Sequence, residues 1–351
     1  MSTPLADQLC ALVAQPGAGP VTGELIALAR RHRVHLLLGD RIADPGLVRE
    51  RRAAAAIEAL REAELRRVLA ALAAGGVPSV LFKGAAISRT HYRSPELRPR
   101  SDTDLLVPAA RRQAAAGVLD TLGYRRAVET DGELIASQFH CAFVDRAQLS
   151  HALDVHWRIS NAIAFAEVLS FDEIAAEATA LPGLGPDAAG PSAVHSLLLA
   201  CVHRIAHHPD SSDLLWLYDI HLLADRLTPG EQRRFVRLAS DRGVRAVCAC
   251  SLDDAALAFG GGAGGLAAGV APPAGAVEPT AAFLAARRRP VDLLTADLRA
   301  LGWPQRLQLL REHVFPRREY MFARYGTRRA SSLPWLYVRR IVAGAPKWFR
   351  V

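Results

Sequence analysis

Apolar residues recur at helical spacing along the first 75 residues. Residues 22–38 are predicted to be helical from four of them: Leu25, Leu28, Val34 and Leu37. Pro45 breaks this pattern, and residues 47–73 then consist almost wholly of Ala, Arg, Glu and Leu. These are strong helix formers, so we predict one long helix, which ends where Gly75 and Gly76 follow.

After residue 77 the pattern changes to short apolar runs separated by turns and short helical segments. Five runs have the length and composition of strands: 79–82, 104–107, 124–128, 140–145 and 151–157. Helical spacing over residues 85–92 and 109–122 separates the first three runs. Residues 77–160 are therefore predicted to form a small core of the α/β or α+β class, and for the whole chain we predict an α+β fold.

Helical spacing returns from residue 192 onward. It is clearest at residues 194–206 and 214–226, whereas residues 259–275 are rich in Gly, Ala and Pro and predict a loose loop. Residues 287–351, here called the C-terminal tail, are basic and are predicted to be mostly helical, with aromatic residues interspersed. The predicted regions are an N-terminal helical region (1–76), the α+β core (77–160) and a C-terminal helical region (161–351).

Composition narrows the class of protein. The chain has 351 residues, half of them hydrophobic, which is enough for one large or two modest domains. Its apolar runs fall short of the roughly 18 residues that a membrane span needs. The N-terminus also lacks the basic start of a signal peptide. Five scattered cysteines do not suggest a disulfide framework, so we expect reduced thiols and a cytoplasmic protein.

The net charge of +8 comes almost entirely from arginine. Of 43 basic residues, 41 are Arg, and only Lys83 and Lys347 are Lys. A chain rich in Ala and Arg indicates a GC-rich genome, so most of its arginines are not evidence for a particular function. A lysine at position 83 is more informative, because a compact ammonium and a guanidinium are not interchangeable at phosphate sites.

The central chemical signal is the segment from Ser101 to Val107, which has the sequence S-D-T-D-L-L-V. Side chains alternate along a strand, so Asp102 and Asp104 are expected on the same face. Two such carboxylates repel each other unless a cation lies between them, and their oxygens suit Mg²⁺. On its own, the pair is more often the solvated start of a strand, so it needs support from other segments.

Two further segments give that support. Lys83 and Gly84 lie between a strand and a helix, where free helix amides and the lysine can bind an anion and the glycine allows close approach. Asp154 lies between apolar neighbours, where a carboxylate is costly unless it is paired or metal-bound. The structural alternatives are a lysine that reaches solvent from a buried strand end and a salt bridge from Asp154 to an arginine.

The order of these segments resembles that of the nucleotidyltransferase superfamily of DNA polymerase beta type. In this order, a strand, Lys-Gly and a helix are followed by D-x-D and then by one Asp on a later strand. The chain looks still more like the bacterial family of uncharacterised nucleotidyltransferases. Members of that family have an L-K-G-A segment, which is similar to Phe82 to Ala85 here. They also have an R-x-x-x-D-x-D-L-L-V segment and a D-x-H-W segment, which are similar to Arg98 to Val107 and Asp154 to Trp157. The likeness covers residues 20–350 and is strongest at 80–107 and 151–158.

The chain departs from the superfamily at the turn before the first helix of the core. The superfamily usually has Gly-Ser there, followed closely by its first aspartate. Here Lys83 precedes Gly84, and Asp102 comes 18 residues after that glycine. A loop that contains Arg93, Arg98 and Arg100 fills the interval, so the phosphate contacts of the superfamily do not transfer directly.

The resemblance implies a minimal nucleotidyltransferase mixed sheet with flanking helical regions. It also implies transfer of a nucleoside monophosphate from an NTP to an acceptor hydroxyl, with release of pyrophosphate and with Mg²⁺ or Mn²⁺ as cofactor. The catalytic and metal-binding residues that it implies are Asp102, Asp104 and Asp154. The residues that it implies for the triphosphate are Lys83, Gly84, Arg98 and Arg100. The C-terminal helical region would then shape the acceptor pocket.

The sequence leaves the acceptor open between a small molecule, tRNA and a protein. The basic C-terminal region is the one hint of nucleic acid. A toxin-like transferase that modifies tRNA or protein is one alternative. A catalytically silent nucleotide-binding or scaffold protein is another, although the presence of all three aspartates argues against it.

Other patterns are weaker. The spacing of Gly260, Gly262 and Gly265 matches a dinucleotide fingerprint but follows no predicted strand. His203 and His207 have the spacing of a helical metal pair but lack the adjacent glutamate of a zinc protease. Whether these histidines, Trp216 and Asp219 contribute to the site stays undecided from the sequence.

Overall fold

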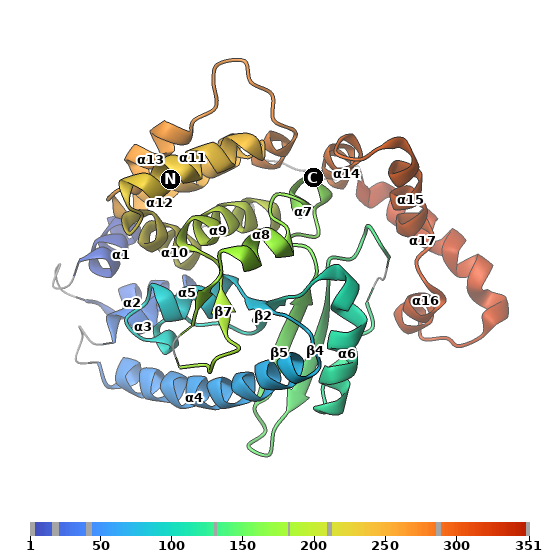
Figure 1. The fold of residues 1–351 in the computed structure, drawn as a ribbon, viewed down its shortest axis with the longest axis horizontal. Coiled ribbons are helices and arrows are strands. Elements are labelled where there is room, and N and C mark those ends of the chain that lie inside the picture. The colour runs from blue at the N-terminus through green and yellow to red at the C-terminus, as the bar shows by residue number, and fades with distance from the viewer. Residues whose placement is uncertain are drawn as a thin grey trace.

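The computed structural model has an α+β fold, as predicted, with a small mixed sheet among many helices (Figure 1). The residues that it describes are 4–15, 21–39, 44–129, 132–181, 183–208, 213–285 and 289–348. Four helices precede the sheet: α1 (Pro4–Ala14), α2 (Gly23–Arg31), α3 (His35–Leu38) and α4 (Pro45–Ala74). The long helix predicted at residues 47–73 is thus confirmed as α4.

The helical segment predicted over residues 22–38 is confirmed, and it forms two helices because the chain turns between α2 and α3. Arg33 adopts a left-handed conformation with φ +58, which an α-helix does not tolerate. The N–H of Val34 then donates to the Ala29 carbonyl. A hydrogen bond of this kind beside a left-handed residue is a common way for a helix to end.

The five predicted strands are all present in one sheet. They are β1 (Val80–Leu81), β2 (Thr103–Leu106), β3 (Arg125–Arg126), β4 (Gln138–Val144) and β5 (Ser150–His156). Their order is β1-β2-β5-β4-β3, and only β2 and β5 are parallel. The elements between the strands are α5 (Lys83–Thr90), η1 (Pro95–Leu97), η2 (Ala109–Arg111) and α6 (Arg112–Thr121).

The two faces of the central strands differ in chemistry. Leu105, Leu153 and Val155 join a hydrophobic core with residues of α4 and α6, such as Leu69 and Leu119. Because side chains alternate along a strand, the residues between them point to the opposite face. That face carries Asp104 of β2 and Asp154 and His156 of β5, and it is the one on which the candidate site lies.

The C-terminal helical region begins after β5. Its elements up to residue 284 are α7 (Ile163–Ala166), α8 (Phe171–Ala176), β6 (Thr179–Ala180), β7 (Ala189–Gly190), α9 (Ala193–His207), α10 (Leu214–Asp225), α11 (Pro229–Asp241), α12 (Arg245–Phe259), α13 (Ala263–Val270) and η3 (Pro279–Leu284). A second hydrophobic core joins α9 and α10 to the N-terminal helices, for example through Leu197 and Leu25. The division of the chain into three regions stays a prediction.

The loose loop predicted at residues 259–275 is wrong over its centre. Residues 263–270 form α13, and α13 buries Ala263, Leu266, Ala267 and Val270 in the second core. These four residues recur at helical spacing, so burial of one face outweighs the cost of roughly 1 kcal/mol that each helical glycine carries relative to alanine.

The C-terminal tail is helical, as predicted. It contains α14 (Pro290–Arg299), α15 (Trp303–Val314), α16 (Arg318–Tyr325), η4 (Ala330–Ser332) and α17 (Leu333–Trp348), which form an arm at one side of the molecule (Figure 1). Among the helices that the structure describes, none combines the length and the apolar character that a membrane crossing requires.

Candidate active site

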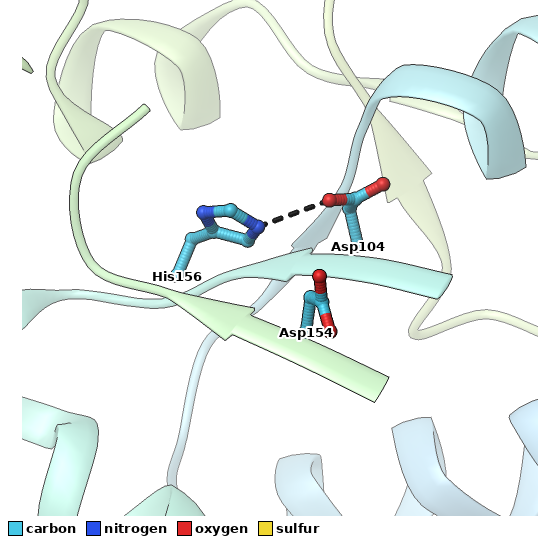
Figure 2. Close-up of side chains that lie close together, drawn as sticks. All are labelled: Asp104, Asp154 and His156. Atoms are coloured by element: carbon cyan, nitrogen blue, oxygen red, sulfur yellow. Dashed lines mark hydrogen bonds and ion pairs between the residues drawn. The ribbon is translucent and has the colours of Figure 1, made fainter. Parts of the chain in front are cut away.

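The candidate site lies where the parallel strands β2 and β5 run side by side. Asp104 on β2 is in register with Asp154 on β5, and His156 follows two residues later on the same face. Ligand atoms of these three residues lie within 4.8 Å of one another. Figure 2 shows the ring of His156 directed at the Asp104 carboxylate, with Asp154 beside them. Strand pairing therefore brings together two aspartates that are 50 residues apart in the chain.

Lys83 approaches this cluster from the first turn of α5. Its Nζ donates to Asp104 Oδ1 at 2.7 Å, and His156 Nε2 lies 3.0 Å from the same oxygen. The backbone of Lys83 is left-handed, with φ +52, a conformation that costs a non-glycine residue about 1–2 kcal/mol. Such strain persists where the surrounding structure holds a residue in place, and here it accompanies a side chain that pairs with Asp104.

The two aspartates have opposite electrostatic environments. Burial alone would raise the pKa of Asp104, but the Lys83 ammonium and the hydrogen bond with His156 hold it well below its ordinary value. Burial raises the pKa of Asp154 to about 6 despite its contact with His140, and the charges of Asp104 and Asp102 act in the same direction. A cation bound near Asp154 would therefore stabilise the ionised form of its carboxylate.

Asp154 has polar neighbours on the adjacent strand β4. His140 contacts its carboxylate through Nδ1, and Gln138 Nε2 donates to Oδ2 at 3.3 Å. Burial and the Lys83 charge lower the pKa of His156, on the other side, to about 4, so that its imidazole is neutral near pH 7. A neutral imidazole can accept a proton or bind a metal.

Asp102 lies in the bend just before β2 and is less enclosed than Asp104. Its Oδ2 accepts a hydrogen bond from Ser101 Oγ at 3.1 Å, and it lines a small cleft with Tyr124 and His151. Within the described residues, the group of ligand atoms around Asp104 does not include Asp102. Metal binding by Asp102 therefore stays a prediction.

The comparison with protein families agrees with this geometry. The sequence profile of the family described as uncharacterised nucleotidyltransferase matches residues 22–260. The chain belongs to this nucleotidyltransferase family. It is therefore an enzyme of phosphorus-containing group transfer, and the matched span includes Lys83, all three predicted aspartates and α9 to α12. No curated protein matches the chain at a significant level.

In this nucleotidyltransferase, Gly84 packs directly against Arg98. A Cβ at position 84 would lie 2.1 Å from Arg98 Nη1, so a larger residue would displace the guanidinium. The other edge of that guanidinium donates to Asp219 at 2.6 and 2.9 Å, and Tyr92 donates to the same carboxylate. Arg98 is thus fixed with Nη1 at the start of α5, next to Lys83.

Arg100 of the nucleotidyltransferase takes part in a different cluster. Its Nη1 donates to Glu58 on α4 at 3.0 Å, and Arg89 pairs with the same carboxylate. The side chain of Arg100 is 4% exposed. These ion pairs link Arg100 to α4, and its contact with the triphosphate stays a prediction.

The structure places three of the residues left undecided by the sequence next to Lys83. His203, Trp216 and Asp219 line a cavity of about 20 Å³, room for a single water, together with Lys83 and Arg98. Nδ1 of His203 and Nε1 of Trp216 are buried without a hydrogen-bond partner, so water is a natural occupant.

His156 is the residue of the nucleotidyltransferase cluster that sequence reasoning did not assign. It stands two positions after Asp154 in a predicted strand, a spacing that places both on one face. This signal was present in the D-x-H-W segment and was sufficient to find it.

Proposed function

We propose that this enzyme transfers a nucleoside monophosphate from an NTP to an acceptor hydroxyl, with Asp104 and Asp154 as its central metal ligands. The single observation that carries the proposal is the register of these two carboxylates on parallel central strands, with Lys83 beside them. Mg²⁺ or Mn²⁺ fits two carboxylates, since both ions prefer oxygen ligands, and the raised pKa of Asp154 favours a cation there. Asp102 is proposed to complete the ligand set.

A divalent cation bound at this cluster would offset the triphosphate charge and lower the pKa of the acceptor hydroxyl. The chain supplies the remaining functions. Lys83 provides a point charge for a phosphate oxygen, and Arg98, fixed by Asp219, presents Nη1 at the start of α5. Asp154 orients the acceptor side, because it is held from β4 by His140 and Gln138.

The general test is incubation with each α-labelled NTP, Mg²⁺ or Mn²⁺, and separate pools of small molecules, tRNA and protein. Transfer of label into one pool is the expected result. Tight NTP binding without label transfer to any pool, or to water, would favour the silent nucleotide-binding protein instead.

Replacing Lys83 by Ala should weaken NTP binding, by roughly tenfold for the loss of one charge-assisted phosphate contact. Replacing it by Arg should preserve part of the affinity, because the charge remains while the compact geometry is lost. Titration of each variant with a fluorescent NTP analogue measures this. Equal affinity in the wild type and Lys83→Ala would show that the lysine serves only as the partner of Asp104.

The proposed acceptor pocket is a cleft of about 300 Å³. It lies between the core, α9 and the first helices of the C-terminal tail, and it is lined mostly by apolar side chains such as Phe283 and Leu309. His207 lines it too. Burial and the Lys83 charge lower the pKa of His207 to about 4, so His207 lies within electrostatic reach of the site. The volume and lining suit a small, largely apolar acceptor.

Replacing Ala206 by Leu should fill part of this cleft. We expect a fall of roughly tenfold in kcat/KM for the acceptor, with NTP affinity unchanged, because Ala206 lines the cleft on α9. Ala56→Leu, on the exposed face of α4, is the matched control. An equal loss in both variants, or none in Ala206→Leu, would place the acceptor elsewhere.

A further inference from the structure

The C-terminal tail carries the positive charge of the whole protein. Residues 287–351 contain fifteen Lys and Arg against four Asp and Glu, a net charge of +11, whereas residues 1–286 carry −3. Exposed arginines include Arg328, Arg329 and Arg339. Charge segregated in this way is the mark of an anionic binding partner.

The same tail exposes large apolar side chains. In the part of the chain that the structure describes, fourteen large hydrophobic residues are exposed, and eight of them lie in this tail, which is less than a fifth of the chain. On α17, Trp335, Val338 and Val342 follow each other at steps of three and four residues and are 67%, 48% and 68% exposed. Residues at these steps share one face of a helix.

This apolar face of α17 points away from the protein. The opposite side of the helix buries Leu336, and α17 chiefly contacts elements of the tail itself, namely α14, α15, α16 and η4. In Figure 1 the tail extends from the body of the molecule as an arm. A groove of about 600 Å³, lined by Leu310, Ile341 and Trp348 among others, continues the apolar surface beside α17.

We infer that α17 binds the surface of a membrane that contains anionic lipids, with Trp335, Val338 and Val342 inserted at the interface and the flanking arginines on the headgroups. An amphipathic helix with this combination of residues lies in the plane of the interface. Nucleic acid would engage the arginines and stack on the tryptophan, but it offers no apolar medium for two valines. A second tail would be repelled by its net charge of +11. The inference rests on the tail alone and not on the transfer reaction.

The test is cosedimentation of the full-length protein with vesicles of phosphatidylcholine, with and without about one-third phosphatidylglycerol. Binding is expected only with phosphatidylglycerol, and it should weaken as salt is raised. The triple variant Trp335→Ser/Val338→Ser/Val342→Ser should bind about tenfold or more weakly, because interfacial binding scales with buried apolar area. Leu257→Ser/Val277→Ser removes two similarly exposed side chains outside the tail and should bind like the wild type.

A charge variant tests the second part of the inference. Arg328→Gln/Arg329→Gln should weaken vesicle binding by roughly fivefold per arginine, whereas Arg49→Gln/Arg52→Gln on α4 should not. Equal binding to both kinds of vesicle would overturn the role of anionic lipid. Two other results would overturn membrane binding itself. One is no sedimentation with vesicles but retention on tRNA or duplex DNA. The other is no sedimentation but a dimer that the triple serine variant dissociates.

Discussion

Replacing Asp104 by Asn is expected to lower the rate of nucleotide transfer by roughly 10³-fold, the equivalent of about 4 kcal/mol of transition-state stabilisation. Asp104 is the only residue of the described cluster that contacts both Lys83 and His156, and its strand β2 is paired on both sides, with β1 and β5. Loss of its charge therefore disturbs the lysine and the proposed metal site together.

The same substitution should also lower stability. Lys83 and Asp104 have side chains that are 13% and 12% exposed, so the lysine would lose its countercharge in a largely buried setting. Asn retains an oxygen acceptor, so we expect a loss of about 1–3 kcal/mol in unfolding free energy rather than complete unfolding. Thermal unfolding followed by circular dichroism measures the stability. Activity should be compared at a temperature at which both proteins are folded.

Asp120→Asn is the matched control for this experiment. Asp120 is an exposed carboxylate on α6 of the same core, and its removal should change neither rate nor stability appreciably. Wild-type transfer rates in folded Asp104→Asn would rule out Asp104 as a metal ligand.

Replacing Asp154 by Asn should separate turnover from nucleotide binding. The NTP can be held largely by Lys83, Arg98 and a metal on Asp104, whereas Asp154 is proposed to act on the acceptor side. A positioned base or activating ligand typically contributes about 10² to 10⁴ in rate. The expected pattern is a fall of this size in kcat with nearly normal NTP affinity, as for an interaction made chiefly in the transition state.

A variant of Gln138, which donates to the Asp154 carboxylate, is the control for Asp154→Asn. Gln138→Ala removes that donor but keeps the carboxylate, so we expect only a modest loss of turnover. Titration with a fluorescent NTP analogue, alongside steady-state rates of label transfer, distinguishes the two effects. If Asp154→Asn lost NTP affinity in proportion to turnover, its role would lie in nucleotide binding.

Much of this arrangement was predictable because it depends on local patterns. The strands that carry Asp104 and Asp154 follow from short apolar runs, and alternation places their side chains on one face. Sequence could not show that β2 and β5 are parallel neighbours, since pairing between strands depends on tertiary packing. Nor could it show that Arg98 would be fixed by Asp219, 121 residues away in the chain.

Local patterns also failed where packing opposed propensity. The glycines of residues 263–270 predict a loop, but the apolar residues between them cover the second core and hold a helix. At Arg33 the sequence pattern predicts helix, but the chain makes a left-handed turn there. The turn contains no Gly or Asn that would have predicted it.

The contact between Lys83 and Asp104 has a consequence for the order in which ligands bind. The lysine acts as an internal counter-ion, so a metal ion that binds Asp104 must exchange with an ammonium rather than meet a free carboxylate. A triphosphate offers that ammonium another anionic partner and so lowers the free energy needed for the exchange. Metal and nucleotide should therefore bind cooperatively, and linkage requires that each raise the affinity of the other by the same factor.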